Sequence, residues 1–531
     1  MSSPDRRTTG PFRRIGLVLR GMGWPLLAGG LAALAFPPLP LLPLLPFAFL
    51  VLMRAIDRAP TTLRAALAGF AFGFGVHAVG LYWLINAILI RASEFWWFVP
   101  FPSLGCALIL APFAAVPAAV CRCVPAGWRR CVLFAAVWTL CDMGRQFLFS
   151  GFTWNPLGSD WAIHGLVGDI MIQPAAWLGV DGLTLVTVIL ALTMPLGRRA
   201  LMAGAFVVML WAGAGALRFY GLASQADVAA AGPTAPVVAL VQGNVPEQEK
   251  ISRLDMQKVF ERYLALTHRG VTGALEESGR TQGAARPVVY VWPETAFPGV
   301  LDEDAQARSM IVRTAEGASA GIVGTLRIGP DQHWRNSVVG LDETGEVAAV
   351  YDKATLVPFG EYQPRFLPLQ VVPGGGMTPG PGPRSWHLPG LEAAGPLVCY
   401  EVIFSGHVVD RHDRPGWLVN VTNDAWYGNS AGPRQHLAAV RLRAVEEGLP
   451  VARAANTGVS IVYDARGHDL GRLEWGIEGV LVRTMPPALP PTIFSRFGQK
   501  IPVALCLLAA LLALFPSRFP SRSGWRVRSG R

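Results

Sequence analysis

The sequence predicts a multi-pass α-helical membrane domain joined to a layered α/β sandwich, and three observations predict it. Of the 531 residues, 52% are hydrophobic and only 15% are charged, which is more apolar than a soluble core of this length needs. Residues 233–493 carry 23 basic and 28 acidic side chains, whereas the rest of the chain carries 23 basic and 8 acidic ones. Short β-branched runs separated by turn signals recur inside that acidic block.

Eight apolar stretches are candidates for crossing about 30 Å of hydrocarbon. They are residues 15–36, 41–53, 65–88, 95–120, 132–149, 175–196, 201–217 and 501–515. The second stretch is short and proline-rich, so a re-entrant or broken element is the alternative there, tolerated only against neighbouring helices.

Arginines cluster in alternate connections between these stretches and in both tails. By the positive-inside rule, both termini are predicted to be cytoplasmic and the acidic block to lie outside. The basic residues do not gather on one folded face, so anionic lipid and topology explain them and nucleic acid is not an expected partner. An export signal at Arg6 and Arg7 is rejected because no convincing cleavage site follows and further spans come directly after it.

The expected organisation has five parts along the chain. A cytoplasmic tail (1–14) precedes a membrane domain with about seven helices (15–220) and an extracytoplasmic α/β domain (221–493). A final span (494–516) and a basic cytoplasmic tail (517–531) complete the chain.

Eight strands are expected in the α/β domain, with helices at 255–268 and 435–447. The strands are residues 237–241, 288–292, 321–326, 337–341, 347–352, 397–400, 417–421 and 459–463. Hairpin turns are expected at 342–345 and 464–467. Residues 360–390 are rich in proline and glycine and are expected to form a long loop.

Three polar residues follow apolar strands: Glu294, Lys353 and Cys399. In a sheet sandwich such strand ends can converge on one rim, which would bring a base, a cation and a thiol into one pocket. A carboxylate can take the thiol proton, an ammonium can favour thiolate and then an oxyanion, and sulfur can form an acyl intermediate.

Each of the three residues also has an ordinary interpretation. A Glu or Lys at a strand end is most often a solvated surface group, and a lone buried Cys usually serves packing. Two features favour a catalytic role. Only four lysines stand beside 42 arginines, and Cys399 is the only cysteine of residues 233–493, so it has no partner there for a disulfide. The other six cysteines, in membrane segments or at their borders, are expected to be apolar filler or reduced thiols.

Sequence motifs around these residues carry a family resemblance. The segments Trp292-Pro293-Glu294, Tyr351-Asp352-Lys353 and Cys399-Tyr400-Glu401 resemble the motifs of the nitrilase superfamily. The segments Val357-Pro358-Phe359-Gly360-Glu361-Tyr362, Asn423-Asp424-Ala425-Trp426-Tyr427-Gly428 and Asn456-Thr457-Gly458 are similar to those of the apolipoprotein N-acyltransferase family of bacterial inner-membrane enzymes. The resemblance extends over nearly the whole chain.

The resemblance implies a nitrilase-like α-β-β-α sandwich on the periplasmic side of the inner membrane, and acyl transfer in two steps. Cys399 would attack the sn-1 ester of a phospholipid, typically phosphatidylethanolamine, with Glu294 as general base and Lys353 stabilising the oxyanion. The α-amino group of a diacylglyceryl-cysteine on a lipoprotein would then take the acyl group. A monomer without cofactor or metal is expected.

Further residues receive roles from the same resemblance. Glu361 is expected to be a second essential carboxylate, while Tyr400 and Glu401 shape the pocket behind the nucleophile, with structural support as the alternative. Asp142 and Arg145 match an acidic and basic pair; they either neutralise each other or meet a lipid headgroup.

The chain departs from the family pattern at two positions, and its long loop suggests a lid. Ile251 stands where relatives often carry tryptophan, and Thr153 where proline is common. Within the proline- and glycine-rich loop, an apolar run is hypothesised to form a mobile lid that admits acyl chains. Its residues are Phe366, Leu367, Leu369, Val371 and Val372.

Two other function classes remain open. A membrane-tethered carbon–nitrogen hydrolase could use the same three residues on a small amide or nitrile, although a single anchor would suffice for tethering. A transporter with an inert outer domain would be expected to carry charges near the middle of its spans, and these spans contain few. A metal-dependent hydrolase is not expected, because the nine histidines include no HExxH and His407 and His412 are poorly spaced for a shared helical face.

Overall fold

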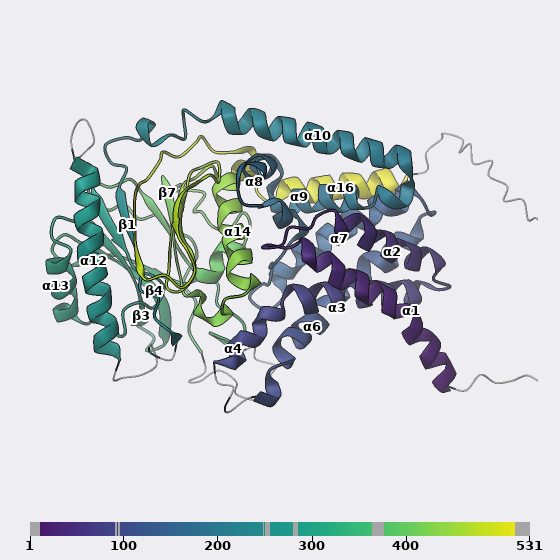
Figure 1. Cartoon of the computed structure of the whole chain (residues 1–531), viewed down its shortest axis with the longest axis horizontal. Helices are drawn as coiled ribbons and strands as arrows, with labels where there is room; N and C mark the ends of the chain where they lie inside the picture. The colour runs from purple at the N-terminus through teal and green to yellow at the C-terminus, as the bar shows by residue number, and fades with distance from the viewer. Residues whose placement is uncertain are drawn as a thin grey trace, which may run out of the picture.

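The computed structural model describes residues 11–90, 93, 96–247, 249, 255–279, 285–363 and 376–515, with the backbone alone over residues 11–20. A helical part and a sheet-containing part lie side by side along the long axis (Figure 1). This arrangement confirms the predicted combination of a helical membrane domain and a layered α/β sandwich.

A helix overlaps each of the eight apolar stretches. These helices are α1 Pro11–Ala32, α2 Leu44–Arg58, α3 Thr62–Gly80, α6 Phe101–Val120, α7 Trp128–Gly144, α9 Ala175–Ala191, α10 Arg198–Gly221 and α16 Lys500–Leu514. The short helices α4 Ile85–Leu89, α8 Leu166–Met171 and α15 Ile493–Phe497 lie in connections among the described residues.

Four helical segments within the described residues are long and apolar enough to cross a membrane by length and composition, fewer than the eight expected. They are residues 62–80, 96–123, 175–196 and 198–221. The difference is mainly one of length, because α2, α7 and α16 have 15, 17 and 15 residues. At 1.5 Å per residue they reach only about 22–26 Å.

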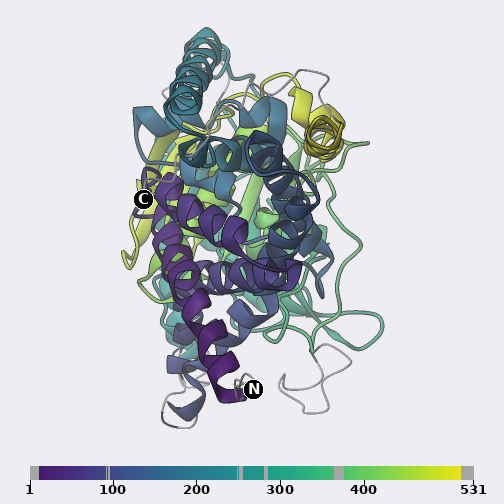
Figure 2. The same ribbon diagram turned by 90° about the vertical axis from the view of Figure 1, so that its right-hand side faces the viewer.

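The short α2 helix follows the proline-rich segment and is buried by its neighbours. Phe49 in α2 packs on Phe72 of α3, with ring centroids 5.3 Å apart, and on Phe134 and Trp138 of α7. By contrast, α10 stands at the edge of the bundle and projects at the top of Figure 2. Only 17% of its most apolar 18-residue stretch is buried inside the structure. The α10 helix therefore offers most of its surface to lipid.

Two sheets form the other part of the molecule. The first has the order β11-β1-β2-β3-β4-β5 and the second the order β10-β9-β8-β7-β6. The strands of the first are β1 Val237–Gln242, β2 Val288–Val291, β3 Ala320–Ile328, β4 Trp334–Asp342, β5 Val347–Asp352 and β11 Gly479–Thr484. Those of the second are β6 Ala394–Val398, β7 Trp417–Thr422, β8 Val451–Ala455, β9 Ser460–Tyr463 and β10 Asp469–Leu473.

The sheets and their helices stack as layers because successive strand residues face opposite sides. In β1, Val238 packs between the sheets with Val419 of β7, whereas Ala239 faces outward onto Tyr263. The outer layers are formed by α12 Met256–Gly279 and α13 Ala305–Thr314 on the first sheet and by α14 Ala431–Glu447 on the second. The α14 helix lies between the second sheet and the membrane-type helices (Figure 1).

The expected strands are present, with one correction and three additions. Residues 397–400 were expected as a single strand, but β6 ends at Val398 and the 3-10 turn η10 Cys399–Ile403 begins at the cysteine. The strands β8, β10 and β11 were not expected, because alanine, arginine and glycine interrupt their β-branched runs. The expected hairpin turns join β4 to β5 and β9 to β10.

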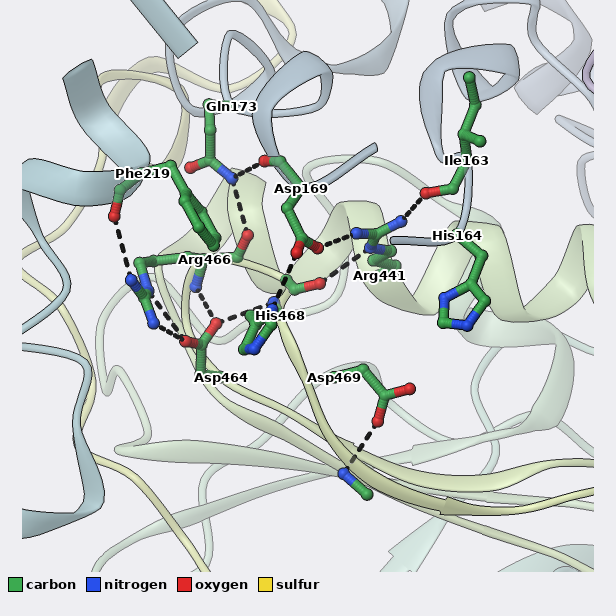
Figure 3. A network of polar contacts seen from close by, with 12 residues as sticks. Ile163, His164, Asp169, Gln173, Phe219, Arg441, Asp464, Arg466, His468 and Asp469 are labelled. Atoms are coloured by element: carbon green, nitrogen blue, oxygen red, sulfur yellow. Dashed lines mark hydrogen bonds and ion pairs between the residues drawn. The ribbon is translucent and has the colours of Figure 1, made fainter. Parts of the chain in front are cut away.

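A polar network fastens the sheet part to the helical part (Figure 3). Arg441 in α14 donates to the Asp169 carboxylate in α8 and, at 2.8 Å, to the carbonyl of Gly467. The Nδ1 atom of His468, in the turn after β9, lies 2.9 Å from Asp169 Oδ2. The two parts are thus joined by buried charges as well as by apolar packing.

A second set of contacts in Figure 3 extends this network toward α10. Gln173 donates to the carbonyl of Arg466 at 2.8 Å, and Arg466 Nη1 donates to the carbonyl of Phe219 at 3.0 Å. The Arg466 guanidinium also lies 4.6 Å above the Phe219 ring. The helices α8, α9 and α10 of the membrane part therefore border the sandwich.

Candidate active site

Cys399 occupies a sharp strand-to-helix turn. It follows the last residue of β6 and has a φ of +48°, a value that residues other than glycine adopt only when their surroundings enforce it. The side chain is buried between the two sheets and only 6% of the residue is exposed. The turn thus presents a thiol at the carboxyl end of the strand, facing the first sheet.

Glu294 reaches the same region from the first sheet. It lies three residues after the end of β2, beside β3. Gly324 in β3 makes the approach possible, because a Cβ atom there would lie 2.0 Å from the carbonyl oxygen of Pro293. The Glu294 Oε2 atom accepts a hydrogen bond of 2.8 Å from the backbone N–H of Asn423, which follows β7 in the other sheet.

Lys353 comes directly after β5 and is 1% exposed. Its Nζ atom donates to Glu361 Oε1 at 2.7 Å and lies 3.3 Å from Glu294 Oε1. Asn336 in β4 donates from Nδ2 to both carboxylates, at 2.7 Å to Glu294 and 2.8 Å to Glu361. One ammonium and one amide therefore hold two carboxylates together in a buried site.

The charges of this site act on one another. Burial by itself would lower the pKa of Lys353, but the Glu361 and Glu294 carboxylates outweigh burial and raise it, so the ammonium stays charged. Burial raises the pKa of the Cys399 thiol, Glu294 raises it further, and Lys353 only partly counters them. The thiol is therefore protonated at rest, although the lysine alone was expected to favour thiolate.

Glu401 ties the lysine strand to the cysteine strand. Its Oε2 atom accepts from the backbone N–H of Val398 at 2.7 Å, and its Oε1 atom accepts from the hydroxyl of Tyr351 at 2.8 Å. The backbone N–H of Ala354 also donates to Oε1, at 2.7 Å. Because these partners flank Lys353 and Cys399 in sequence, Glu401 fixes the distance between the ends of β5 and β6.

A loop of the helical part supports the cysteine turn from behind. Tyr400 donates from its hydroxyl to the carbonyl of Gly151 at 2.6 Å, and Thr153 Oγ1 donates to the carbonyl of Ile403 at 3.1 Å. The Tyr400 ring stacks on Trp154 with centroids 6.4 Å apart. Residues 150–154 thus hold η10 from the side of the membrane helices.

Asp142 and Arg145 are not brought to the three strand-end residues. Arg145 Nη2 lies 3.3 Å from Asp142 Oδ1, and Arg145 Nη1 donates to the carbonyl of Trp154 at 2.9 Å. The pair is buried at the end of α7, where it supports the same loop from the helical side. The structure therefore favours mutual neutralisation over an open headgroup site.

Three residues close to the site received no role from the sequence. Asn336 bridges the carboxylates, Asn423 holds Glu294 through its backbone, and His436 in α14 lies 3.0 Å from the carbonyl oxygen of Cys399. Asn336 stands between Arg335 and Ser337 in the polar first half of β4, so its sequence context does not single it out. Asn423 holds Glu294 through its backbone N–H, so the type of its side chain does not reveal this contact in the sequence.

Some sequence predictions lie outside the described residues. These are Ile251 and the hypothesised lid residues Phe366, Leu367, Leu369, Val371 and Val372. Within the described ranges, no group of three or more His, Cys, Asp or Glu side chains is arranged to hold a metal ion.

Comparisons with known proteins cover both parts of the chain. Residues 28–193 match the apolipoprotein N-acyltransferase N-terminal domain, and residues 237–489 match the carbon-nitrogen hydrolase family. Among solved structures, an amidase of the nitrilase superfamily from Nesterenkonia AN1 is similar at 21% identity and a TM-score of 0.36, over 51% of this chain and 96% of that one.

Curated relatives align with almost the whole chain. The apolipoprotein N-acyltransferase of Bradyrhizobium diazoefficiens is 34% identical over 540 residues, which cover 95% of this chain and 97% of the relative. The enzyme of the same name from Rhodopseudomonas palustris is 33% identical with the same coverage, and that of Sinorhizobium medicae is 33% identical over 94% of this chain and 96% of its own. Because the match spans the helices and the sandwich alike, this chain belongs to the apolipoprotein N-acyltransferase family.

Proposed function

We propose that this enzyme moves the sn-1 acyl chain of a phospholipid to the α-amino group of a diacylglyceryl-cysteine at the N-terminus of a lipoprotein. Cys399 is the nucleophile, Glu294 the general base and Lys353 the group that stabilises negative oxygen. The observation that carries the proposal is the meeting of these three side chains, from three strand ends and two sheets, in one buried site.

The first step forms an acyl-enzyme. Glu294 takes the proton of the Cys399 thiol as Sγ attacks the ester carbonyl carbon, because the thiol is protonated at rest. The carbonyl oxygen becomes an oxyanion beside Lys353, which has three N–H donors and uses two on Glu294 and Glu361 within the described residues. The bond from carbon to the glycerol oxygen then breaks, and that oxygen leaves as an alcohol with the proton held by Glu294.

The second step regenerates the thiol. The acceptor amine attacks the thioester carbon while Glu294 takes a proton from the nitrogen, and a second oxyanion forms beside Lys353. The carbon–sulfur bond breaks, and the proton on Glu294 returns to Sγ. The products are an amide-linked third acyl chain and free enzyme, so donor and acceptor react by ping-pong kinetics.

Supporting roles follow from the contacts around the three residues. Glu361 is a second essential carboxylate because it orients the Lys353 ammonium at 2.7 Å. Glu401 and Tyr400 shape the site from behind the nucleophile by holding β5 and residues 150–154 against η10. Asp142 and Arg145 support the site indirectly, because Arg145 holds the loop of residues 150–154 by donating to the carbonyl of Trp154.

The membrane orientation is proposed from charge and contact. Arg122 donates to the carbonyl of Ala59 at 2.5 Å, and Arg129 donates to the carbonyl of Leu514 at 2.8 Å, so the arginines between α6 and α7 contact both the arginine-rich connection after α2 and the end of α16. The α1 helix begins and the α16 helix ends at this same end, far from the sheets (Figure 1). By the positive-inside rule this end is cytoplasmic and the sandwich is periplasmic. The domain limits proposed are 15–220 for the first helices, 221–493 for the sandwich and 494–516 for the last span.

The proposal also names an acyl donor and an oligomeric state. A zwitterionic phospholipid such as phosphatidylethanolamine is the proposed donor, and a monomer is the proposed working unit. Glu294, Lys353 and Cys399 all belong to one chain, which supports the monomer.

The test combines a labelled donor with intact-mass analysis. Purified enzyme is mixed with phosphatidylethanolamine labelled in the sn-1 chain, and the acyl-enzyme is followed by mass before a diacylated lipopeptide is added. Wild type is expected to gain one acyl group, which leaves when the lipopeptide is added. Cys399→Ala is expected to gain none, and Glu294→Gln to acylate more slowly by about 10²–10⁴-fold, the usual contribution of a general base.

Two results would count against the proposal. Acylation of Cys399→Ala at the wild-type rate would place the nucleophile elsewhere. Release of ammonia from a small amide without any transfer from phospholipid would instead favour a membrane-tethered carbon–nitrogen hydrolase.

A further inference from the structure

His436 is a buried histidine on α14, between the second sheet and the membrane-type helices. It is fully enclosed, with 0% of the residue exposed. A buried imidazole is normally satisfied by partners on both ring nitrogens, so the identity of these partners decides what the residue does.

One ring nitrogen meets the nucleophile itself. His436 Nε2 lies 3.0 Å from the carbonyl oxygen of Cys399. A carbonyl oxygen can only accept, so Nε2 carries the proton and donates. The contact falls on the residue whose φ is +48°, where the backbone needs an external restraint to hold an uncommon conformation.

The other ring nitrogen lies between a carboxylate and an arginine. His436 Nδ1 is 3.1 Å from Asp424 Oδ1 and 3.2 Å from Arg453 Nη2, and Arg453 also donates to Asp424 Oδ2 at 2.7 Å. Burial and the Arg453 charge lower the pKa of His436, although Asp424 partly counters them, so the ring is neutral and carries one proton. With that proton on Nε2, the ring donates to Cys399 and its Nδ1 accepts from Arg453.

The same cluster reaches the general base. Asp424 Oδ1 accepts from the Thr422 hydroxyl at 3.0 Å, and the residue between them, Asn423, donates its backbone N–H to Glu294 at 2.8 Å. The loop after β7 therefore positions Glu294 on one side and the ring of His436 on the other, through Asp424 directly and through Arg453.

We propose that His436 is a positioning residue for the acylation step: its Nε2–H holds the carbonyl of Cys399 and so aims the thiol at Glu294 and at the ester carbon. This inference rests on the proposed role of Cys399 as nucleophile. His436 is not a base toward the thiol, because its contact is with the backbone oxygen and its second nitrogen faces Asp424 and Arg453.

Substitutions that differ in the reach of one N–H group test the proposal in the full-length enzyme. In His436→Gln the amide nitrogen can occupy the place of Nε2, whereas in His436→Asn it reaches only the place of Nδ1. His436→Leu removes every donor at similar volume. The single-turnover rate constant and amplitude of acyl-enzyme formation are measured by mass with labelled phosphatidylethanolamine, over a range of lipid concentrations.

The Asn and Leu variants are expected to acylate about 100-fold more slowly at saturating lipid, because a small misplacement of a reacting group costs about that much. The half-saturating lipid concentration and the amplitude are expected to stay at the wild-type values. The Gln variant is expected to keep most of the rate and the wild-type pH profile. A purely structural role would lower the amplitude, as misfolded enzyme accumulates, without changing the rate constant.

Ser278→Ala is the matched control, since it removes a buried hydrogen bond of 2.7 Å to the carbonyl of Arg286, on the far helix α12. It is expected to acylate at the wild-type rate. If His436→Leu does not fold, the acylation rates of His436→Gln and His436→Asn still test the proposal.

Several outcomes would overturn the proposal. Equal rates for Gln and Asn, a wild-type rate for Leu, or a pH profile that loses an ionisation in the Gln variant would each do so. Failure of all three variants to fold would assign His436 to the core alone. Absence of acylation in wild type would instead contradict the proposed function, which keeps the two failures distinct.

Discussion

At the scale of single residues, Asn336 decides how two carboxylates share one lysine. Glu294 and Glu361 both point their Oε1 atoms at Lys353, and like charges at such distances repel in a buried site. Asn336 donates to both atoms and so offsets the second negative charge without adding a positive one. The amide holds the Glu294 carboxylate in a fixed orientation for proton transfer.

Asn336→Ala is expected to slow acyl-enzyme formation by about 10–100-fold, because a hydrogen bond to a charged group contributes about 1.5–3 kcal/mol. Asn336→Asp has nearly the same shape but adds a third carboxylate, so a larger loss is expected. The single-turnover rate of acylation measures both. A wild-type rate in the Asp variant would mean that the bridge has no electrostatic role.

The protonation of Cys399 gives a prediction about pH. Burial and Glu294 raise the pKa of the thiol above its ordinary value of 9.0, so alkylation of Cys399 by iodoacetamide is expected to be slower at pH 8 than that of a free thiol. The rate is expected to keep rising above pH 9 as thiolate forms. Peptide mass analysis separates Cys399 from the exposed Cys123. Half-maximal labelling below pH 8 would contradict the assignment of a protonated resting thiol.

The sequence indicated the three strand-end residues but not their neighbours. Glu294, Lys353 and Cys399 each follow an apolar run, a pattern that can be read without coordinates. Asn336 was missed because one amide within a strand has many ordinary explanations. The contact between His436 and the carbonyl of Cys399 joins positions 37 residues apart through a backbone atom, and no side-chain pattern reports such a contact.

At the scale of elements, the connection from α7 to α8 does more than link two helices. Its residues 150–154 bond to η10 through Tyr400 and Ile403, so the turn that carries Cys399 is held from both sides. Gly151 packs closely on Phe404: its φ is +102°, and an added Cβ atom would lie only 2.5 Å from the Phe404 ring. A side chain at this position would push the loop away from η10.

Gly151→Ala and Gly165→Ala form a matched pair that tests this loop. Both glycines have positive φ and lie in the same connection, but a Cβ atom on Gly165 would meet nothing within 4 Å. Both variants are expected to lose about 1 kcal/mol from backbone strain. Only Gly151→Ala is expected to slow acylation and to lower the melting temperature further. Equal behaviour of the two variants in thermal denaturation and single-turnover acylation would contradict a role for the loop contact.

The sequence predicted elements where periodicity was strong and missed them where it was weak. The β-branched runs of β1 to β5 were recognised, but β8 has the sequence VARAA and owes its strand conformation to pairing between β7 and β9. Likewise η10 was expected to continue β6, because residues 397–400 are apolar throughout. The turn arises from tertiary contacts of Glu401 with Tyr351 and of Tyr400 with Gly151, which local propensity does not contain.

At the scale of the whole molecule, the sandwich and the membrane-type helices share a core. One apolar cluster contains Trp83 and Trp154 from the helical part together with Leu418 and Val440 from the sandwich. Gln435 in α14 accepts hydrogen bonds of 2.9 Å from both tryptophan indoles. The two parts are therefore expected to unfold together rather than as separate domains.

The contact between His468 and Asp169 makes this union depend on pH. The hydrogen bond with Asp169 raises the pKa of His468 above its ordinary value of 6.5. Its stabilisation is therefore complete below pH 6.5 and is lost as the pH rises through the higher pKa of the folded state. The melting temperature is expected to fall between pH 6 and pH 8 more in wild type than in His468→Gln.

His412, which is exposed and outside this network, supplies the control for that measurement. His412→Gln is expected to reproduce the wild-type pH dependence of melting. Identical curves for His468→Gln and wild type would show that the contact does not contribute to holding the two parts together.

The tryptophan pair on Gln435 has a consequence for where this chemistry can occur in a cell. Severing the sandwich from the membrane-type helices would remove the apolar cover from α14 and η10 and leave a fragment with an exposed apolar face. A protease could destroy this protein but could not release a working soluble form of it. Acyl groups taken from the bilayer would therefore never be carried away from it on a diffusing enzyme.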